Sequence, residues 1–243
     1  MKPEIVNLGS LYFNATPVIP GAMYQPNLSL AIGNTVPRHK IQWLKDGDRL
    51  IAIGNVCNDI SWERLDRLGF VFGTPIRIDA RLYLCRSLKV GSKKDEGSEW
   101  DNLVARYGED NTLWHWKEVF FWGQDSVQGD DHLRAVRGCY SAKYFGHYYA
   151  TTHGTGLGFR PVLEPLPCPS TPLDTLLGKN IGAYGPQGNI IKGILAEFDE
   201  YDMVLTSIAK VPEGCAWAHR AGLKVVVSRD QVLWLEESVA KDI

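Results

Sequence analysis

The sequence predicts an α+β fold that is divided into two modules. Before residue 161, two helix starts stand among segments that alternate like strands. Five prolines between Pro161 and Pro172 stop regular structure and stiffen the chain, so they predict the boundary between the modules. Beyond them, short apolar runs separated by turns predict a small β-barrel. We expect an arm over residues 1–45 that packs on the next domain, a first domain over 46–165 and a second over 171–243.

The first module begins with turn and strand signals. Residues 1–40 contain several Pro, Gly and Asn, and we expect an extended arm or irregular strands there. A turn at residues 45–48 precedes a strand over 50–53. Alternating apolar residues predict a hairpin of strands over 74–78 and 81–85. Strands are also expected over 135–138 and 158–163, with short irregular elements over 114–116 and 120–122.

Two serines predict the starts of the two helices. Ser61 can cap a helix over 62–68 that Gly69 closes. Ser98 begins a segment that resembles a capping box, and it predicts a second helix that ends at Gly108. The middle of the module is rich in tryptophan, a residue that usually anchors a core or an interface.

Composition excludes several classes of protein. Apolar residues make up 44% of the chain, which is enough for a sizeable core, and the net charge of −2 provides no basic field for nucleic acid. No apolar run reaches about 18 residues, so we expect no membrane partner. The first residues lack the basic and apolar regions of a signal peptide. The cysteines are widely spaced, without a Cys-x-x-Cys pair, which predicts free thiols and no zinc ribbon; they are Cys57, Cys85, Cys139, Cys168 and Cys215.

A run of Tyr, His, Thr and Ser fills the segment between Arg137 and Phe159. Tyr offers a wide contact area at little rotamer cost, and Ser and Thr offer adaptable hydrogen bonds, as in antibody paratopes. This composition indicates a contact surface. The alternative is that the segment is part of the core, in which case alternating strands would bury half of its side chains, Phe145 first.

Residues 49–165 resemble the C-type-lectin-like fold of bacteria and phages, in particular the variable proteins of diversity-generating retroelements and the formylglycine-generating-enzyme-like domains. The resemblance is carried by the two early helices, the Trp-rich middle, Arg137-Gly138 before the insert and Gly158-Phe159-Arg160 after it. It implies an α+β scaffold, including these closing residues and the tryptophans, that displays the insert, and it implies a phage or prophage origin or a bacterial accessory role. The implied ligand-binding residues are Tyr140, Ser141, Lys143, Tyr144, Phe145, His147, Tyr148, Tyr149, Thr151, Thr152, His153 and Thr155.

Catalytic patterns are missing from the sequence. The enzymatic branch of the resembled family uses two cysteines in the insert, whereas this insert holds Cys139 alone. There is no Gly-x-Ser-x-Gly elbow, and the glycines of 154–158 precede a strand rather than a helix. We expect no enzyme activity, no catalytic residue, no cofactor and no metal. His115 beside Glu118 is interpreted as structural, and the acidic group at 199–202 as a solvated turn. A remnant of formylglycine-type chemistry would require a reactive Cys139.

Residues 171–237 resemble an Sm/Hfq-like barrel. Lys192 to Leu205 is similar to the first Sm motif, with Leu195, Phe198, Val204 and Leu205 expected in the core. The last two expected strands, over 225–228 and 231–235, correspond to the second Sm motif, with a tight turn at Arg229-Asp230 between them. Ser228-Arg229 replaces the basic and aromatic or His pair of Hfq. The resemblance implies homo-oligomerisation or docking through residues 171–243.

Together these observations predict a non-enzymatic receptor- or target-recognition protein of the diversity-generating-retroelement variable-protein type, cytoplasmic or virion-associated. Its partner would be a protein or a glycan, and the second domain would make it an oligomer. The alternative is a ring-forming RNA or nucleotide binder that uses the Sm-like domain. Basic residues are few there, so nucleic acid has weak support. An inert accessory domain is a further alternative for the second module.

Overall fold

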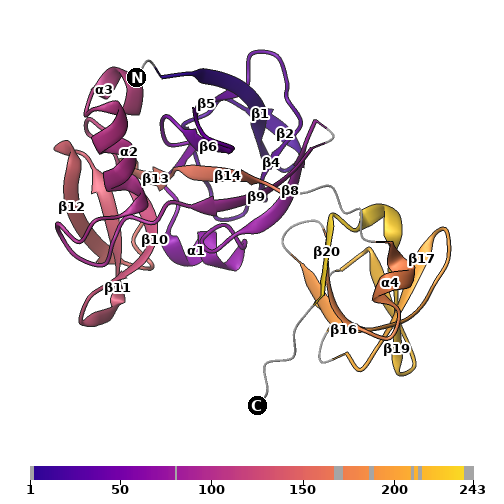
Figure 1. Ribbon diagram of the computed structural model, residues 1–243. Helices are drawn as coiled ribbons and strands as arrows, with labels where there is room; N and C mark the ends of the chain where they lie inside the picture. Colours follow the sequence, from indigo (N-terminus) through magenta and orange to yellow (C-terminus); the bar gives the residue numbers. More distant parts are fainter. Residues whose placement is uncertain are drawn as a thin grey trace. The chain divides into compact units, whose positions relative to one another are not determined.

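In the computed structural model of this chain, strands make up 51% of the residues and helices 12%. The α+β prediction is therefore wrong, and the fold class is mainly β. The helices are short, and segments expected to be irregular form strands. The structure describes residues 3–79, 81–166, 172–185, 189–208, 211–212 and 215–237, and it divides into two units, Met1–Pro165 and Leu166–Ile243 (Figure 1).

The first sheet of unit 1 contains the N-terminal segment. Side chains of β5 alternate, so that Ile41 and Trp43 are buried while Lys40 and Gln42 are exposed. All its pairings are antiparallel, in the order β2-β1-β5-β6-β14-β9-β8, and β4 also pairs with β1. The hairpin predicted over 74–85 is confirmed as β8 and β9, with Ala80 outside the described residues. The strands are β1 (Ile5–Phe13), β2 (Thr16–Val18), β4 (Leu30–Gly33), β5 (Lys40–Asp46), β6 (Arg49–Ala52), β8 (Thr74–Ile78), β9 (Arg81–Ser87) and β14 (Pro161–Pro165).

The second sheet has the order β12-β11-β10-β13-β7-β3, which leaves β12 as an edge strand. The single closing strand predicted over 158–163 is wrong, because the chain passes from one sheet to the other at Arg160. β13 lies in the second sheet, and β14 lies in the first. The strands are β3 (Ala22–Met23), β7 (Cys57–Asn58), β10 (Phe120–Val127), β11 (Asp130–Gly138), β12 (Ser141–Tyr149) and β13 (Leu157–Phe159).

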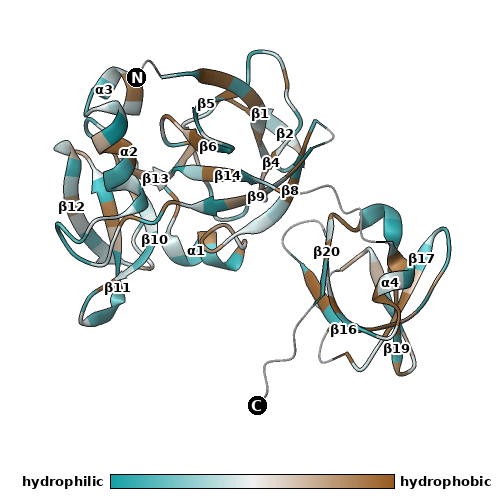
Figure 2. Cartoon of the chain, in the orientation of Figure 1, coloured by the Kyte–Doolittle hydropathy of each residue, from teal (hydrophilic) through white to brown (hydrophobic). Residues whose placement is uncertain are grey.

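The two predicted helices are confirmed, and each has the predicted serine cap. The Oγ of Ser61 accepts the N–H of Arg64 at 3.2 Å before α1 (Trp62–Arg67), and the Oγ of Ser98 accepts the N–H of Asp101 at 3.1 Å before α2 (Glu99–Tyr107). Hydrophobic and hydrophilic residues intermix along α2 (Figure 2), and it buries Trp100, Leu103 and Val104. A short α3 (Asn111–Trp114) follows.

Unit 2 is one antiparallel sheet in the order β18-β19-β17-β16-β15-β20. Leu195 and Leu205 are buried as predicted, but Met203 takes the core position expected for Val204, because side chains alternate along β17. Phe198 is half-buried, and a 3₁₀ turn at Arg229–Gln231 replaces the tight turn. The elements are α4 (Leu173–Leu176), β15 (Asn180–Tyr184), β16 (Ile190–Phe198), β17 (Asp202–Thr206), β18 (Ala218–Ala221), β19 (Lys224–Ser228) and β20 (Trp234–Glu237).

Candidate functional site

Three exposed tyrosines, from β12 and the turn before it, surround Phe120 of β10. The ring centroids of Tyr140 and Tyr144 lie 6.0 Å from that of Phe120, and the ring centroid of Tyr148 lies 5.6 Å from it. Tyr140 is 70% exposed, Tyr144 40% and Tyr148 36%. No hydrogen bond joins their hydroxyls to another residue in the described part of the chain. We call Tyr140, Tyr144, Tyr148 and Phe120 the tyrosine surface; its rings are held by one another, and its hydroxyls are free for a ligand.

Strand register places two of these tyrosines on one face. Tyr148 pairs with Arg134 and Gly146 with Val136, so Tyr144, Gly146 and Tyr148 share the face of Val136. A Cβ on Gly146 would lie 3.2 Å from Cε1 of Tyr144 and 3.3 Å from Cγ2 of Val136. The absence of a side chain at Gly146 therefore leaves room for the Tyr144 ring.

The backbone before β12 turns through two residues with positive φ. Gly138 has φ +103°, and a Cβ there would lie 2.5 Å from the carbonyl oxygen of Val119. Cys139 has φ +67°, and its N–H donates to the carbonyls of Trp116 and Val119, both at 2.8 Å. These constraints fix the point from which Tyr140 projects.

Buried side chains hold the start of β12. Nη1 of Arg137 donates to the carbonyl of Lys143 at 3.0 Å, and its Nη2 pairs with Oδ2 of Asp101 at 2.8 Å. Nε1 of Trp100 donates to the carbonyl of Ala142 at 2.7 Å. Arg137 and Trp100 are buried, so they anchor the β12 backbone from inside the domain.

The closing residues Gly158, Phe159 and Arg160 are also buried. The Arg160 guanidinium carbon lies 4.4 Å from the ring centroid of Phe121 and 5.2 Å from that of Trp100, and Nη2 donates to the carbonyl of Trp114 at 2.6 Å. Complete burial lowers the pKa of Arg160 to about 9. Arg160 thus lies in the interior of unit 1, away from solvent.

The other predicted ligand-binding residues fall into two further groups. Phe145, His147 and Tyr149 alternate with the tyrosines of β12 and face the opposite side, where Phe145 is half-buried under Arg137. Ser141 is half-buried, and Lys143 pairs with Glu109 at 2.7 Å. The remaining residues form the turn after β12. None of the twelve is buried; the turn group consists of Thr151, Thr152, His153 and Thr155.

His153 of the turn group borders a small cavity that is separate from the tyrosine surface. Nδ1 of His153 lies 2.9 Å from Oδ1 of Asp59, and His153 lines a cavity of about 250 Å³ together with Tyr24 and Arg64. The structure therefore does not bring all twelve residues together. Sequence reasoning missed Phe120, which was placed in an irregular element; its neighbours Phe121 and Trp122 are buried in different core clusters.

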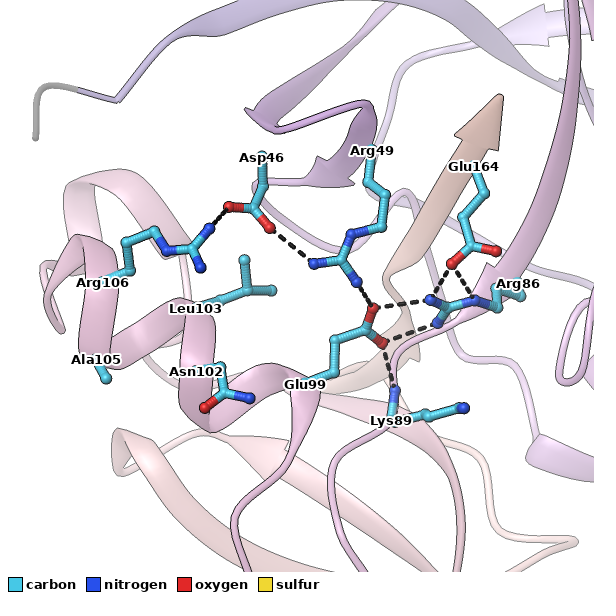
Figure 3. Close-up of a pocket in the computed structure, with 10 residues that line it drawn as sticks. All are labelled: Asp46, Arg49, Arg86, Lys89, Glu99, Asn102, Leu103, Ala105, Arg106 and Glu164. Carbon is cyan, nitrogen blue, oxygen red and sulfur yellow. Dashed lines mark hydrogen bonds and ion pairs between the residues drawn. The ribbon is translucent and has the colours of Figure 1, made fainter. Parts of the chain in front are cut away.

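A larger polar cavity of about 770 Å³ is lined by charged residues, most of which pair with one another (Figure 3). Glu99 accepts both Nη1 and Nη2 of Arg86 at 2.8 Å and Nη1 of Arg49 at 2.5 Å. Every N–H group of the Arg86 guanidinium has an acceptor, with Glu164 and the Ser87 carbonyl completing the set. Because this network is saturated, we interpret it as a structural clamp between the start of α2 and the first sheet.

The clamp lowers the pKa values of two carboxyl groups. Burial alone would raise the pKa of Glu99, but hydrogen bonds from Arg86 and the Lys89 N–H, with the charges of Arg86 and Arg49, lower it overall. Burial would also raise the pKa of Asp46. Hydrogen bonds from Arg49 and Tyr107, together with the charge of Arg106, outweigh burial, so the pKa of Asp46 is lowered. Both groups are therefore held as carboxylates in the folded chain.

Cysteine chemistry has little support in the structure. Cys57, Cys85, Cys139 and Cys215 are free thiols, and Cys168 lies outside the described residues. Burial, with a smaller effect of Glu118, raises the pKa of Cys139, which disfavours its thiolate. Within the described ranges, no group of three or more His, Cys, Asp or Glu is arranged to hold a metal, and no helix is long and apolar enough to cross a bilayer.

Comparisons of the chain with protein families, with curated proteins and with solved structures found no match. The assignment of a function to the tyrosine surface therefore depends on its geometry and on the residues that support it.

Proposed function

We propose that this protein binds a protein or glycan ligand without catalysis, through the tyrosine surface. The observation that carries the proposal is the exposure of Tyr140, Tyr144 and Tyr148 around Phe120, with hydroxyls that no described residue engages. Tyrosine rings supply contact area with few rotatable bonds, so these side chains lose little conformational entropy when a ligand binds. The Arg137 and Trp100 bonds to the β12 backbone reduce that cost further.

The bracketing motifs also support recognition as the role. Arg137-Gly138 and Gly158-Phe159-Arg160 resemble the borders of the variable segment in diversity-generating-retroelement variable proteins, and most side chains between them are partly or fully exposed. We propose that this chain acts as a target-recognition protein of that type, from a phage or prophage.

For unit 2 we propose oligomerisation or docking. Its sheet order leaves β18 and β20 as end strands, and unpaired strand edges favour pairing with another chain. Light scattering of the full chain tests this idea. A mass that is a multiple of the chain mass supports it, whereas a monomer at all concentrations contradicts oligomerisation.

The RNA-binding alternative gains little from the geometry of unit 2. Nζ of Lys224 pairs with Glu197 and Nζ of Lys179 with Glu237, each at 2.8 Å, and Arg229 donates to the carbonyl of Asp199. Phosphate binding requires basic groups that are free to neutralise charge. We therefore keep recognition by unit 1 as the proposed function.

The test is a selection with the full chain against a glycan microarray and a displayed random-peptide library. Ligands found for the wild type are then measured against a Tyr140→Ala/Tyr144→Ala double variant. The matched control is Tyr201→Ala, which removes a tyrosine that is 72% exposed in unit 2. We expect a loss of at least about tenfold in affinity for the double variant only. Equal affinities for all three proteins would contradict the proposal.

A further inference from the structure

A third cavity in unit 1 has a basic rim. Its volume is about 570 Å³, within the range of small-molecule sites. Its charged lining residues are Arg38 and Lys40, His115 also lines it, and none of the described residues that line it is acidic. The lining comes from the N-terminal segment, from the loop before β7 and from the residues after α3. The positive charge of the lining therefore favours a negatively charged ligand.

The two cations are free to bind an anion. Neither Arg38 nor Lys40 forms an ion pair with a carboxylate in the part of the chain that the structure describes, and both are exposed. Arg38 has φ +70° and His115 has φ +44°, conformations that are uncommon for residues other than glycine. Such strained backbone is concentrated at binding sites, and here both residues border one cavity.

The cavity also offers apolar groups beside its two cations. Ile19, an apolar side chain that is 68% exposed, lines the cavity with Val119. A ligand with both an anionic group and an apolar face matches this lining.

We propose that this cavity binds a small organic anion, in which one carboxylate, phosphate or sulfate group is attached to a compact body with an apolar face. Arg38 and Lys40 hold the anionic group by charge-assisted hydrogen bonds. Ile19 and Val119 contact the body. This site does not depend on the tyrosine surface, so either proposal can fail while the other stands.

The experiment is calorimetric titration of the full chain with benzoate, phenyl phosphate and phenyl sulfate, and with neutral benzyl alcohol, which has the same ring. We expect at least one anion to bind about tenfold more tightly than benzyl alcohol, and the preferred anion identifies the acidic group. Arg38→Gln and Lys40→Gln should each weaken that anion about fivefold or more. Arg77→Gln is the matched control, because Arg77 is exposed on β8 and does not line the cavity.

Three results would overturn the proposal. One is that none of the anions binds at about 10 mM, a concentration that detects even millimolar affinity. Another is that benzyl alcohol binds as tightly as the anions. The third is that Arg77→Gln weakens binding as much as Arg38→Gln, which would indicate a general effect of charge. Because the substitutions are at exposed residues, all these variants are expected to fold.

Discussion

Replacing Glu99 by Gln tests the structural clamp that orients α2. Glu99 is the shared acceptor of Arg86 and Arg49, and the Glu99 and Arg86 side chains are 9% and 8% exposed. Gln keeps the shape of the side chain but removes the charge and turns one acceptor into a donor that faces Arg86. The change therefore leaves a buried guanidinium with only Glu164 as a charged partner.

The expected loss in the free energy of unfolding follows from that burial. Removing one partner of a buried ion pair costs about 3–5 kcal/mol, and because Glu164 remains we expect the lower end, about 3 kcal/mol. The matched control is Glu63→Gln, which breaks an ion pair to Arg67 whose members are 43% and 65% exposed. That loss should be under about 0.5 kcal/mol, because exposed pairs are screened by solvent.

Urea denaturation followed by tryptophan fluorescence measures both free energies of unfolding, and unit 1 holds six of the eight tryptophans. Because the folded-state pKa of Glu99 is lowered, its contribution to stability is present above the unfolded pKa and is lost as pH falls below about 4.3. The stability of the Glu99→Gln variant should then depend less on acid than that of the wild type. A cost below about 1 kcal/mol, or an unchanged acid dependence, would refute the clamp.

Three further predictions concern the support of β12. Trp100→Phe removes the hydrogen bond to the Ala142 carbonyl, so it should lower the free energy of unfolding by about 1–3 kcal/mol and speed amide hydrogen exchange in β12. The control, Trp116→Phe at a more exposed residue, should not speed exchange there, and equal exchange in both variants would argue against anchoring by Trp100. Gly138→Ala should lower the melting temperature more than Gly129→Ala, since both have positive φ but only Gly138 lacks room for a Cβ; similar melting would contradict this. Cys139, whose pKa is raised, should react with a thiol reagent at pH 8 more slowly than free cysteine, and fast labelling would instead favour the chemistry of a reactive thiol.

Local signals in the sequence were enough to predict helices α1 and α2 and one hairpin. A helix start depends on a few neighbouring residues, so Ser61 and Ser98 could be recognised as caps before α1 and α2. Strand pairing is not local in this way. β1 pairs with β5 although residues 14–39, which are rich in turn signals, lie between them, and the sequence alone suggested an arm there.

Strand β10 was missed for a different reason. Phe121 is buried in one core cluster and Trp122 in the other, so the strand is apolar on both faces and shows no alternation. The composition of the insert predicted an exposed segment, but not which side chains share a face. That division depends on the irregular register between Arg137 and Gly138, which offsets β12 against β11.

The central claim is that the tyrosine surface binds the ligand, and the most direct test is the dissociation constant of a ligand selected on the wild type. We would measure it for the full chain and for its Tyr144→Ala and Tyr144→Phe variants. Tyr144→Ala should weaken binding at least about tenfold, and Tyr144→Phe by a smaller factor that reports the free hydroxyl. Dissociation constants that are the same for all three proteins would contradict the claim.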